Sequence, residues 1–185
     1  MARLAALYTS DAALIRCEID RVRDEIDLDG NETYAGVGTF YDNVVLHRTY
    51  ASGIPRDGIW DVPDSDAAIF ASGSLHPGQK LEDNAQPFRF RHWLFAAIAE
   101  TDRSDEVRRH LFDTLPEFLQ SLVRGTTLEE VLFAVFLSHL RKLGRTEDPS
   151  LEAPLAAQIL MRVGRAVDDV PALSPSSVKA KLIFA

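Results

Sequence analysis

Residues 83–99, which read DNAQPFRFRHWLFAAIA, constrain the fold of this 185-residue chain more than any other segment. In FRFRH, at residues 88–92, ring-bearing side chains alternate with arginines, which is the period-two pattern of a β-strand with one buried face. The following residues 93–99 form a continuous apolar run, as expected for a strand that is covered on both faces. The segment therefore predicts one or two strands that lie between other layers of the protein.

Other segments are expected to add strands and the loops between them. Three short, mostly apolar segments are predicted to be strands, the first two of them buried: residues 3–8, 67–72 and 178–185. Residues 36–41 and 44–50 are predicted to pair as a hairpin, because the intervening Asp42–Asn43 is a two-residue turn of the hairpin type. Three segments have loop composition, and the first two are expected to be exposed: residues 27–33, 51–66 and 73–84. The first of these contains an Asp-x-Asp-Gly run but lacks the Glu that closes a calcium-binding loop.

A helix is predicted over residues 12–26. Ile15, Ile19 and Val22 recur at spacings of four and three, which places them on one face. The single cysteine, Cys17, lies off the centre of this stripe, so we expect an idle thiol. One cysteine cannot form an internal disulfide, and no cluster of metal-ligating residues accompanies it, so no metal or cofactor is expected.

Three further helices are predicted toward the C-terminus: residues 104–122, 131–143 and 151–167. Pro116 is expected to kink or end the first of them. Thr127 and Glu130 match the Thr-x-x-Glu capping box, which marks the start of the second. Runs of strands followed by runs of helices indicate an α+β fold, here in one domain over residues 1–185.

The charge of the chain excludes some classes of function. The formal net charge is −8, and the basic residues are scattered apart from the pair Arg108–Arg109. Nucleic acids and anionic membranes are bound by clustered Lys and Arg, so neither partner is expected. The N-terminal residues lack the features of a signal peptide, and no apolar run is long enough to cross a membrane. A soluble, cytoplasmic protein is therefore expected.

Several motifs occur together and in one order along the chain: Met1-Ala2-Arg3-Leu4, Gly36-x-Gly38 with Tyr41-Asp42, GSLHPG at 73–78 before Asn84-Ala85-Gln86-Pro87-Phe88, Trp93-Leu94-Phe95-Ala96, and Gly125-Thr126-Thr127-Leu128-Glu129-Glu130. With these motifs the chain resembles the class II glutamine amidotransferases, which are N-terminal-nucleophile hydrolases, and in particular their small stand-alone members. The resemblance implies a four-layer αββα sandwich. Because that family usually continues beyond the strand matching KLIFA, it also implies that this chain lacks the C-terminal part.

The resemblance assigns chemical roles to positions that here hold unsuitable residues. The family's N-terminal cysteine, which attacks the glutamine amide as a thiolate, corresponds to Ala2. The family's His-Asn-Gly, which contributes to the oxyanion hole, corresponds to Ala97, Ile98 and Ala99. The nucleophile and the Asn donor are therefore both absent.

The two groups that would hold the substrate glutamine are also missing. The family's loop arginine, which pairs with the α-carboxylate, corresponds to Gly73, and its aspartate, which holds the α-amino group, corresponds to Leu128. Joint replacement of separate catalytic roles favours natural divergence over an engineered substitution.

The sequence thus predicts a catalytically inactive relative, a pseudoenzyme that serves as a binding, regulatory or assembly module. Its partner is expected to be another protein or a second copy of the chain, through an open strand edge near the C-terminus. A small apolar ligand could occupy the remnant pocket. The residues expected around that pocket are Arg3, His76, Asn84, Gln86 and Thr127.

The alternative is a divergent amidohydrolase or transferase with a rebuilt active site. Its candidate nucleophiles are Thr9, Ser10, Cys17, Ser72 and Ser74, and its candidate bases are His47, His76, His92, His110 and His139. His76 is the strongest candidate for a polar role, because it lies in the loop beside the predicted pocket. No Gly-x-Ser-x-Gly or His-x-x-x-His motif supports this alternative.

Overall fold

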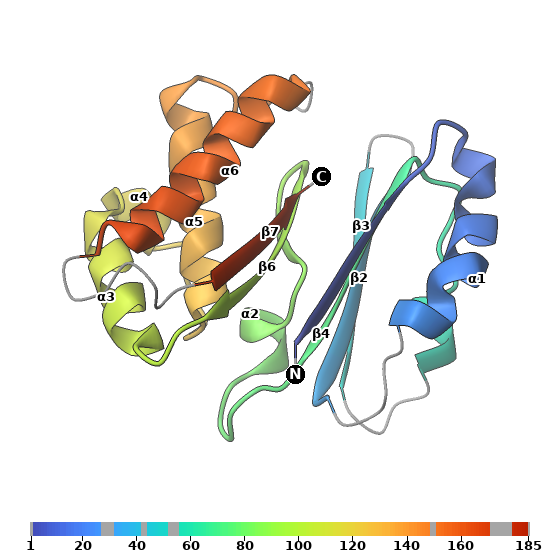
Figure 1. Cartoon of the computed structure of the whole chain (residues 1–185), viewed down its shortest axis with the longest axis horizontal. Coiled ribbons are helices and arrows are strands. Elements are labelled where there is room, and N and C mark those ends of the chain that lie inside the picture. Colours follow the sequence, from blue (N-terminus) through green and yellow to red (C-terminus); the bar gives the residue numbers. More distant parts are fainter. Residues whose placement is uncertain are drawn as a thin grey trace. The chain divides into compact units, whose positions relative to one another are not determined.

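The computed structural model describes residues 2–26, 32–41, 44–51, 56–148, 151–170 and 179–184 (Figure 1). The chain forms two compact units, one of residues 1–96 with 183–185 and one of residues 97–182. No helix in the described part of the chain is both long enough and apolar enough to span a membrane.

The first unit is built on an antiparallel sheet of four strands in the order β1-β4-β2-β3. The strands are β1 (Arg3–Tyr8), β2 (Tyr34–Tyr41), β3 (Val44–Ala51) and β4 (Ala67–Gly73). Tyr41 pairs with Val44, which confirms the predicted hairpin, although its turn residues lie outside the described part. β1 and β3 form the two edges of this sheet.

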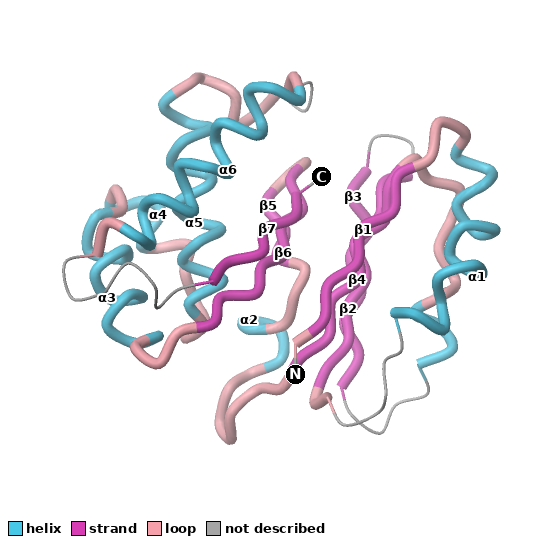
Figure 2. The backbone as a smooth tube through the Cα atoms, in the orientation of Figure 1, coloured by secondary structure: helices cyan, strands magenta, loops and turns pink. Residues whose placement is uncertain are grey.

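A helical layer covers one face of the sheet (Figure 2). It consists of a 3₁₀ turn (Ala12–Leu14) followed by α1 (Ile15–Ile26). Asp11 caps this segment by accepting a hydrogen bond from the backbone N–H of Ala13. Ile15 and Ile19 are buried in one core cluster with Val37 and Phe70 of the sheet, so the stripe predicted from the sequence is confirmed.

The other face of the sheet packs against the first half of β6 (Trp93–Glu100), a strand that pairs with β5 (Phe88–Phe90). Leu94 and Ala96 share a core cluster with Val45 and Ile69. The predicted strand region is thus a pair of strands, which turn at Arg91, whose φ of 54° lies in the left-handed region. The third strand of this sheet is β7 (Lys179–Phe184), in the order β5-β6-β7, as predicted for the C-terminal segment.

The second unit contains the remaining helices: α3 (Ser104–Thr114), α4 (Glu117–Gln120), α5 (Leu128–Lys142) and α6 (Ala153–Asp168). The predicted helix over 104–122 ends before Pro116 and resumes after it, which confirms the expected boundary. α5 is buried along most of its length, as its sequence predicts, and packs against both α3 and α6.

Three loop and strand predictions were wrong in part. β1 is a half-buried edge strand and not a buried one, because within the described part of the chain it pairs only with β4, and Tyr8 at its end is 80% exposed. Residues 51–66 are not simply an exposed loop, since they include a 3₁₀ turn, η2 (Arg56–Ile59), and bury both Ile59 and Val62. The loop at 73–84 ends in a short helix, α2 (Leu81–Asn84).

Most of the first predicted turn, residues 27–31 with the calcium-like run, lies outside the described residues. The described end of this segment, residues 32–33, was expected to be solvated, which is wrong for Glu32. Glu32 is only 2% exposed, and its Oε1 lies 3.9 Å from Nε of Arg3. An ion pair with a residue distant in sequence explains a buried carboxylate that local composition does not indicate.

Candidate functional site

The predicted site residues fall into two groups, one in each unit. In the first unit, Tyr34 pairs with Gly73 where β2 begins and β4 ends. A Cβ placed on Gly73 would lie 3.0 Å from both Cε1 and the hydroxyl oxygen of Tyr34. The ring of Tyr34 is 4% exposed, so it fills the space into which a side chain at position 73 would extend.

Arg3 of the predicted pocket pairs with Ser72 across β1 and β4. The hydroxyl of Ser72 is buried and has no hydrogen-bond partner among the described residues. Because that oxygen is closed to solvent, Ser72 is not accessible as a nucleophile. Glu32, which sequence reasoning did not select, joins this polar group through Arg3.

Asn84 and Gln86 are both buried. Nδ2 of Asn84 donates a hydrogen bond to the carbonyl oxygen of Lys80, at 2.8 Å. The backbone of Gln86 lies so close to β2 that a Cβ on Gly36 would be 2.0 Å from its carbonyl oxygen. The glycine at position 36 is therefore required for close backbone approach, and the Gly-x-Gly motif is explained by packing.

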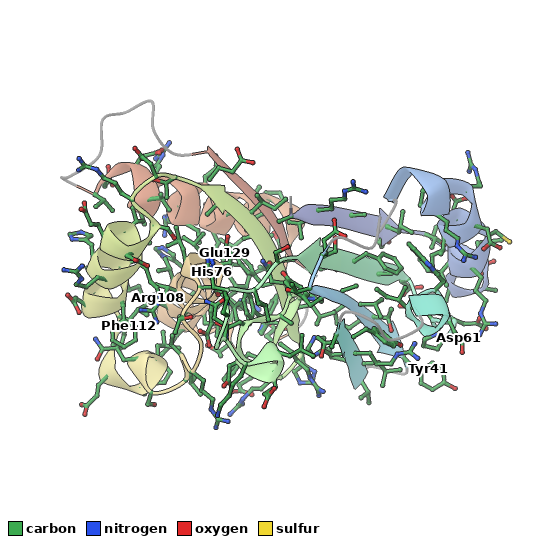
Figure 3. The ribbon with its side chains drawn as sticks, turned by 90° about the horizontal axis from the view of Figure 1, so that it is seen from below. Tyr41, Asp61, His76, Arg108, Phe112 and Glu129 are labelled. Carbon is green, nitrogen blue, oxygen red and sulfur yellow. The ribbon has the colours of Figure 1, made fainter. Side chains whose placement is uncertain are left out.

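His76 has an exposed side chain in the loop that follows β4 (Figure 3). Its backbone N–H donates to Oε1 of Gln79 at 2.8 Å, and the neighbouring N–H of Leu75 donates to the hydroxyl of Thr33 at 2.6 Å. The loop is thus fixed by one hydrogen bond within itself and one to the distant Thr33. No hydrogen bond or ion pair of the His76 imidazole is present within the described part of the chain.

In the second unit, the predicted capping box is confirmed in one direction. The hydroxyl of Thr127 accepts a hydrogen bond from the N–H of Glu130, at 3.4 Å. The carboxylate of Glu130 accepts hydrogen bonds from the N–H groups of Arg124 and Gly125, each at 2.8 Å. Glu130 therefore fixes the turn that precedes α5. Arg108 of α3 holds the same turn, because its Nη2 donates to the carbonyl oxygen of Gly125 at 2.9 Å.

The predicted positions next to this turn are apolar and mostly covered. Leu128 is buried at the first position of α5, and Ala97 is buried in β6, while Ile98 and Ala99 are half-buried. The N–H of Ala99 donates to Oε1 of Glu129 at 3.3 Å. Glu129 therefore contacts this end of β6 through its side chain.

Glu129 of α5 is half-buried, and its carboxyl group has a shifted pKa (Figure 3). Burial raises the pKa of its carboxyl group, against hydrogen bonds from its own backbone N–H and from Ala99, which lower it. Sequence reasoning missed this residue as a titratable group. A Glu in the first turn of a helix ordinarily faces solvent, and no local signal indicates that β6 covers it.

The remaining candidates of the rebuilt-site alternative do not form a catalytic pair. Ser10, Cys17, Ser74, His92 and His110 are exposed. Burial lowers the pKa of His47, and the positive charge of Arg89 lowers it further. Burial also lowers the pKa of His139, and the charges of Lys142 and Arg162 add to this effect. Among the described residues, no candidate hydroxyl or thiol is hydrogen-bonded to a histidine, and no three His, Cys, Asp or Glu side chains are grouped as metal ligands.

Comparison with known proteins adds evidence on the fold. No family model matches the sequence, and no curated protein matches it. A glutamine aminotransferase class-II domain protein from Silicibacter pomeroyi has a similar structure, with a TM-score of 0.53 and 17% identity over 98% of this chain and 72% of that one. The glutamine phosphoribosylpyrophosphate amidotransferase from B. subtilis, solved with ADP and GMP, has a TM-score of 0.52 and 9% identity.

The second match covers the whole of this chain but only 35% of the B. subtilis enzyme. At such low identities the likeness concerns the fold. The chain therefore has a mixed α and β architecture with antiparallel sheets, similar to the glutamine amidotransferase domains of the N-terminal-nucleophile type. This agrees with the α+β class predicted from the sequence and with the type of domain that the motifs resemble.

Proposed function

We propose that this chain is a class II glutamine amidotransferase-type domain that does not hydrolyse glutamine and serves as a binding or assembly module. The observation that carries the proposal is the packing of Tyr34 against Gly73. The resemblance places the arginine that binds the substrate carboxylate at this position. Here an aromatic ring fills the space, so a substrate-binding side chain is absent and its return is sterically opposed.

The other vacated positions support the same proposal. A methyl group at Ala2 cannot form a thioester. Leu128 is buried and offers no acceptor for an ammonium group. Ile98 supplies no side-chain donor for an oxyanion, a contribution that is commonly worth about 10²–10³ in rate. Loss of all these groups removes both the attack on the amide and the placement of the substrate.

We also propose a layered arrangement of the fold. Within the first unit, α1, the four-stranded sheet, and β5 with β6 form successive layers. The four-layer αββα sandwich of that family is proposed as the finer description of the fold. We further propose a cytoplasmic protein that assembles with a second copy or a protein partner. Sheet edges favour such pairing, and β1, β3 and β7 are terminal strands of their sheets.

A glutaminase assay tests the loss of activity. The full-length protein is incubated with glutamine, and released glutamate is measured by a coupled dehydrogenase. We expect no release above the protein-free rate, either for the unchanged chain or for Ala2→Cys, because a restored thiol still lacks the substrate-holding groups. Saturable glutamate release by the unchanged chain would contradict the proposal. Full activity of Ala2→Cys would show that only the nucleophile is missing.

A hydrolase with a rebuilt site is the second candidate, and Glu129 is the observation that favours it. A half-buried carboxyl group with a raised pKa is suited to general acid–base chemistry. A screen of amide and ester substrates distinguishes the candidates. Turnover that is lost in Glu129→Gln or His76→Ala but kept in Glu100→Gln, an exposed control on β6, would favour the enzyme.

A further inference from the structure

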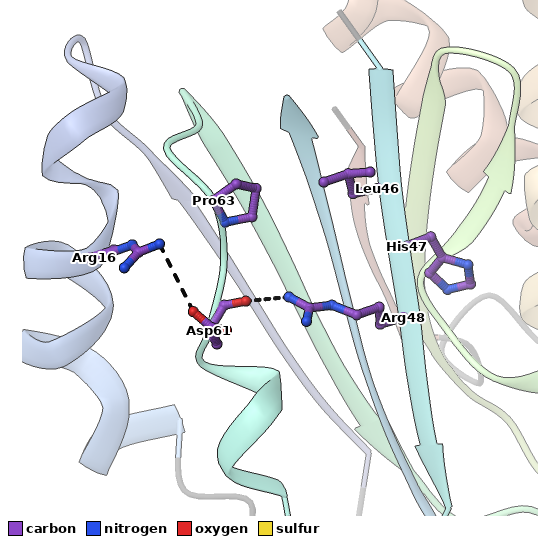
Figure 4. A pocket seen from close by; sticks show the side chains of 6 residues that line it. All are labelled: Arg16, Leu46, His47, Arg48, Asp61 and Pro63. Atoms are coloured by element: carbon purple, nitrogen blue, oxygen red, sulfur yellow. Dashed lines mark hydrogen bonds and ion pairs between the residues drawn. The ribbon is translucent and has the colours of Figure 1, made fainter. Parts of the chain in front are cut away.

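An open hollow of about 420 Å³ lies on the first unit, beside the edge strand β3 (Figure 4). Its lining comes from three elements, α1, β3 and the segment after η2: Arg16, Leu46, His47, Arg48, Asp61 and Pro63. It lies on the α1 side of the sheet, since Arg16 belongs to α1. None of the positions that the glutamine amidotransferase resemblance assigns to chemistry lines it.

The side chains of Leu46 and Arg48 lie on the hollow side of β3, while His47 points to the other side (Figure 4). This follows from the alternation of side chains along a strand. Leu46 is 39% exposed, and Val44, two residues before it on the same side, is 52% exposed. The strand therefore presents apolar surface to solvent beside a guanidinium group.

The charge around the hollow is positive, although the whole chain is acidic. Arg16 donates from Nε to the carbonyl oxygen of Val62 at 3.1 Å, and its Nη2 lies 3.9 Å from Oδ1 of Asp61. Arg48 donates to the backbone carbonyl oxygen of Asp61. Asp61 is the single acidic residue among the described lining residues, and its carboxylate lies near Arg16, whereas Arg48 contacts its backbone carbonyl. Hydrogen bonds to carbonyl oxygens orient both arginines without neutralising them.

The edge of β3 away from β2 carries no further strand among the described residues. Among the described residues, β3 pairs with β2 alone, in an unbroken register from Tyr34–Ala51 to Tyr41–Val44 that leaves no place for a bulge. Tyr50 is packed against Gly58 of η2, which covers the end of the strand. Residues 44–48 contain no proline, lysine or acidic residue that would block edge pairing.

We propose that residues 44–48 of β3 bind an extended acidic peptide of a partner protein as an additional strand. Backbone hydrogen bonds along the edge would supply affinity, and side chains that alternate into the hollow would supply specificity. An apolar side chain of the peptide contacts Leu46, and an acidic one, two positions away, lies between Arg16 and Arg48. This surface is distinct from the vacated amidotransferase positions, so the inference stands apart from the proposed function.

The charge also argues against a second copy of this chain as the occupant. The strand VVLHRTYA carries an arginine and a histidine but no Asp or Glu. Pairing of two β3 strands would bring like charges into one sheet and would supply no further carboxylate to the arginines of either copy. An acidic peptide from another protein complements the hollow better.

Selection from a random heptapeptide phage library against the full-length protein tests this inference. We expect enriched peptides to carry Asp or Glu two positions from an apolar residue. Binding of the leading synthetic peptide, measured by fluorescence anisotropy, should weaken about tenfold or more in Arg16→Glu and in Arg48→Glu. Arg109→Glu is the matched control. Arg109 is exposed on α3, and its substitution makes the same change in net charge.

Two further readouts make the outcome decisive. Peptide binding should slow amide hydrogen exchange at residues 44–48, while circular dichroism confirms that both variants remain folded. Failure to enrich any peptide, binding that both charge reversals leave unchanged, or exchange protection elsewhere would overturn the proposal. Sedimentation that shows β3-dependent dimers in place of peptide binding would assign the edge to a second copy and would equally overturn it. None of these results depends on glutamine hydrolysis.

Discussion

Tyr34 and Gly73 face each other at the ends of β2 and β4, and the Tyr34 ring occupies the space that a side chain at position 73 would need. The family resemblance shows only that Gly73 stands where the family has an arginine. The structure shows that this glycine is part of a packed core. The vacated position has become a structural one, which is the physical reason for expecting that a single reversion does not restore chemistry.

The variant Gly73→Ala tests this packing directly. Its Cβ would meet two atoms of Tyr34 at 3.0 Å, closer than ordinary van der Waals contact, so we expect a loss of about 1–3 kcal/mol in the free energy of unfolding. Urea denaturation measures the loss. The double variant Tyr34→Ala/Gly73→Ala should lose less than the sum of the two single changes, because removal of the ring relieves the contact.

Gly164→Ala is the matched control for that experiment. No atom lies within 4 Å of a Cβ placed at position 164, which is in the interior of α6. Alanine there should stabilise the protein by about 0.5–1 kcal/mol, through its higher helix propensity. Equal effects of Gly73→Ala and Gly164→Ala would show that the ring of Tyr34 does not constrain position 73.

The two glycines of the Gly-x-Gly motif should differ in their sensitivity to substitution. A Cβ at Gly36 would lie 2.0 Å from the backbone carbonyl oxygen of Gln86, whereas a Cβ at Gly38 would first meet the side chain of Leu94, at 2.7 Å. A side chain can move more easily than a backbone. We expect Gly36→Ala to cost roughly 3 kcal/mol or more and Gly38→Ala roughly 1–3 kcal/mol. The reverse order in thermal or urea unfolding would contradict this account.

The carboxylate of Glu130 should be important for stability because it accepts two backbone hydrogen bonds from the turn before α5. Glu130→Ala leaves both N–H groups without this acceptor, and we expect a loss of roughly 2–4 kcal/mol. Glu130→Gln keeps one acceptor oxygen and should lose less. Urea denaturation of both variants, with Glu117→Ala at an exposed site of α4 as control, measures the difference. Equal stability of Glu130→Ala and the control would contradict the assigned hydrogen bonds.

Periodic patterns predicted the elements of the fold, while the burial of irregular segments was not predictable. Ile15 and Ile19 lie on the face of α1 that the three- and four-residue spacing indicated. Ile59 and Val62 are equally buried, but they stand in a stretch rich in Gly, Pro and Asp. Such composition reports local turn formation and does not report which residues the rest of the chain covers.

In the candidate site, too, local sequence patterns predicted the elements but not the tertiary contacts. The capping motif of α5 was visible in the sequence, and Thr127 does cap the helix. The direction of the Glu130 carboxylate depends on the path of residues 124–125, and the burial of Glu129 depends on β6, which is distant in sequence. Contacts of this kind are decided by tertiary packing, so a local motif can suggest the residue but not its partner.

The raised pKa of Glu129 gives a prediction with a definite sign. Because burial places the folded pKa above the unfolded one, the protein takes up a proton on folding at pH values between the two. The charged carboxylate thus costs stability above the folded pKa. This cost declines as the pH falls through the folded pKa and is absent below the unfolded value.

The variant Glu129→Gln removes the charge and keeps an acceptor oxygen for the N–H of Ala99. It should therefore be more stable than the unchanged protein at pH 7, and the difference should disappear toward pH 4, below the ordinary pKa of 4.5 for a solvated Glu side chain. Urea unfolding across this range measures the effect, with Glu100→Gln as a control for the change in net charge. A stability difference that is independent of pH would show that Glu129 is not desolvated by its contact with β6, and a difference that grows on acidification would reverse the assigned direction of its pKa.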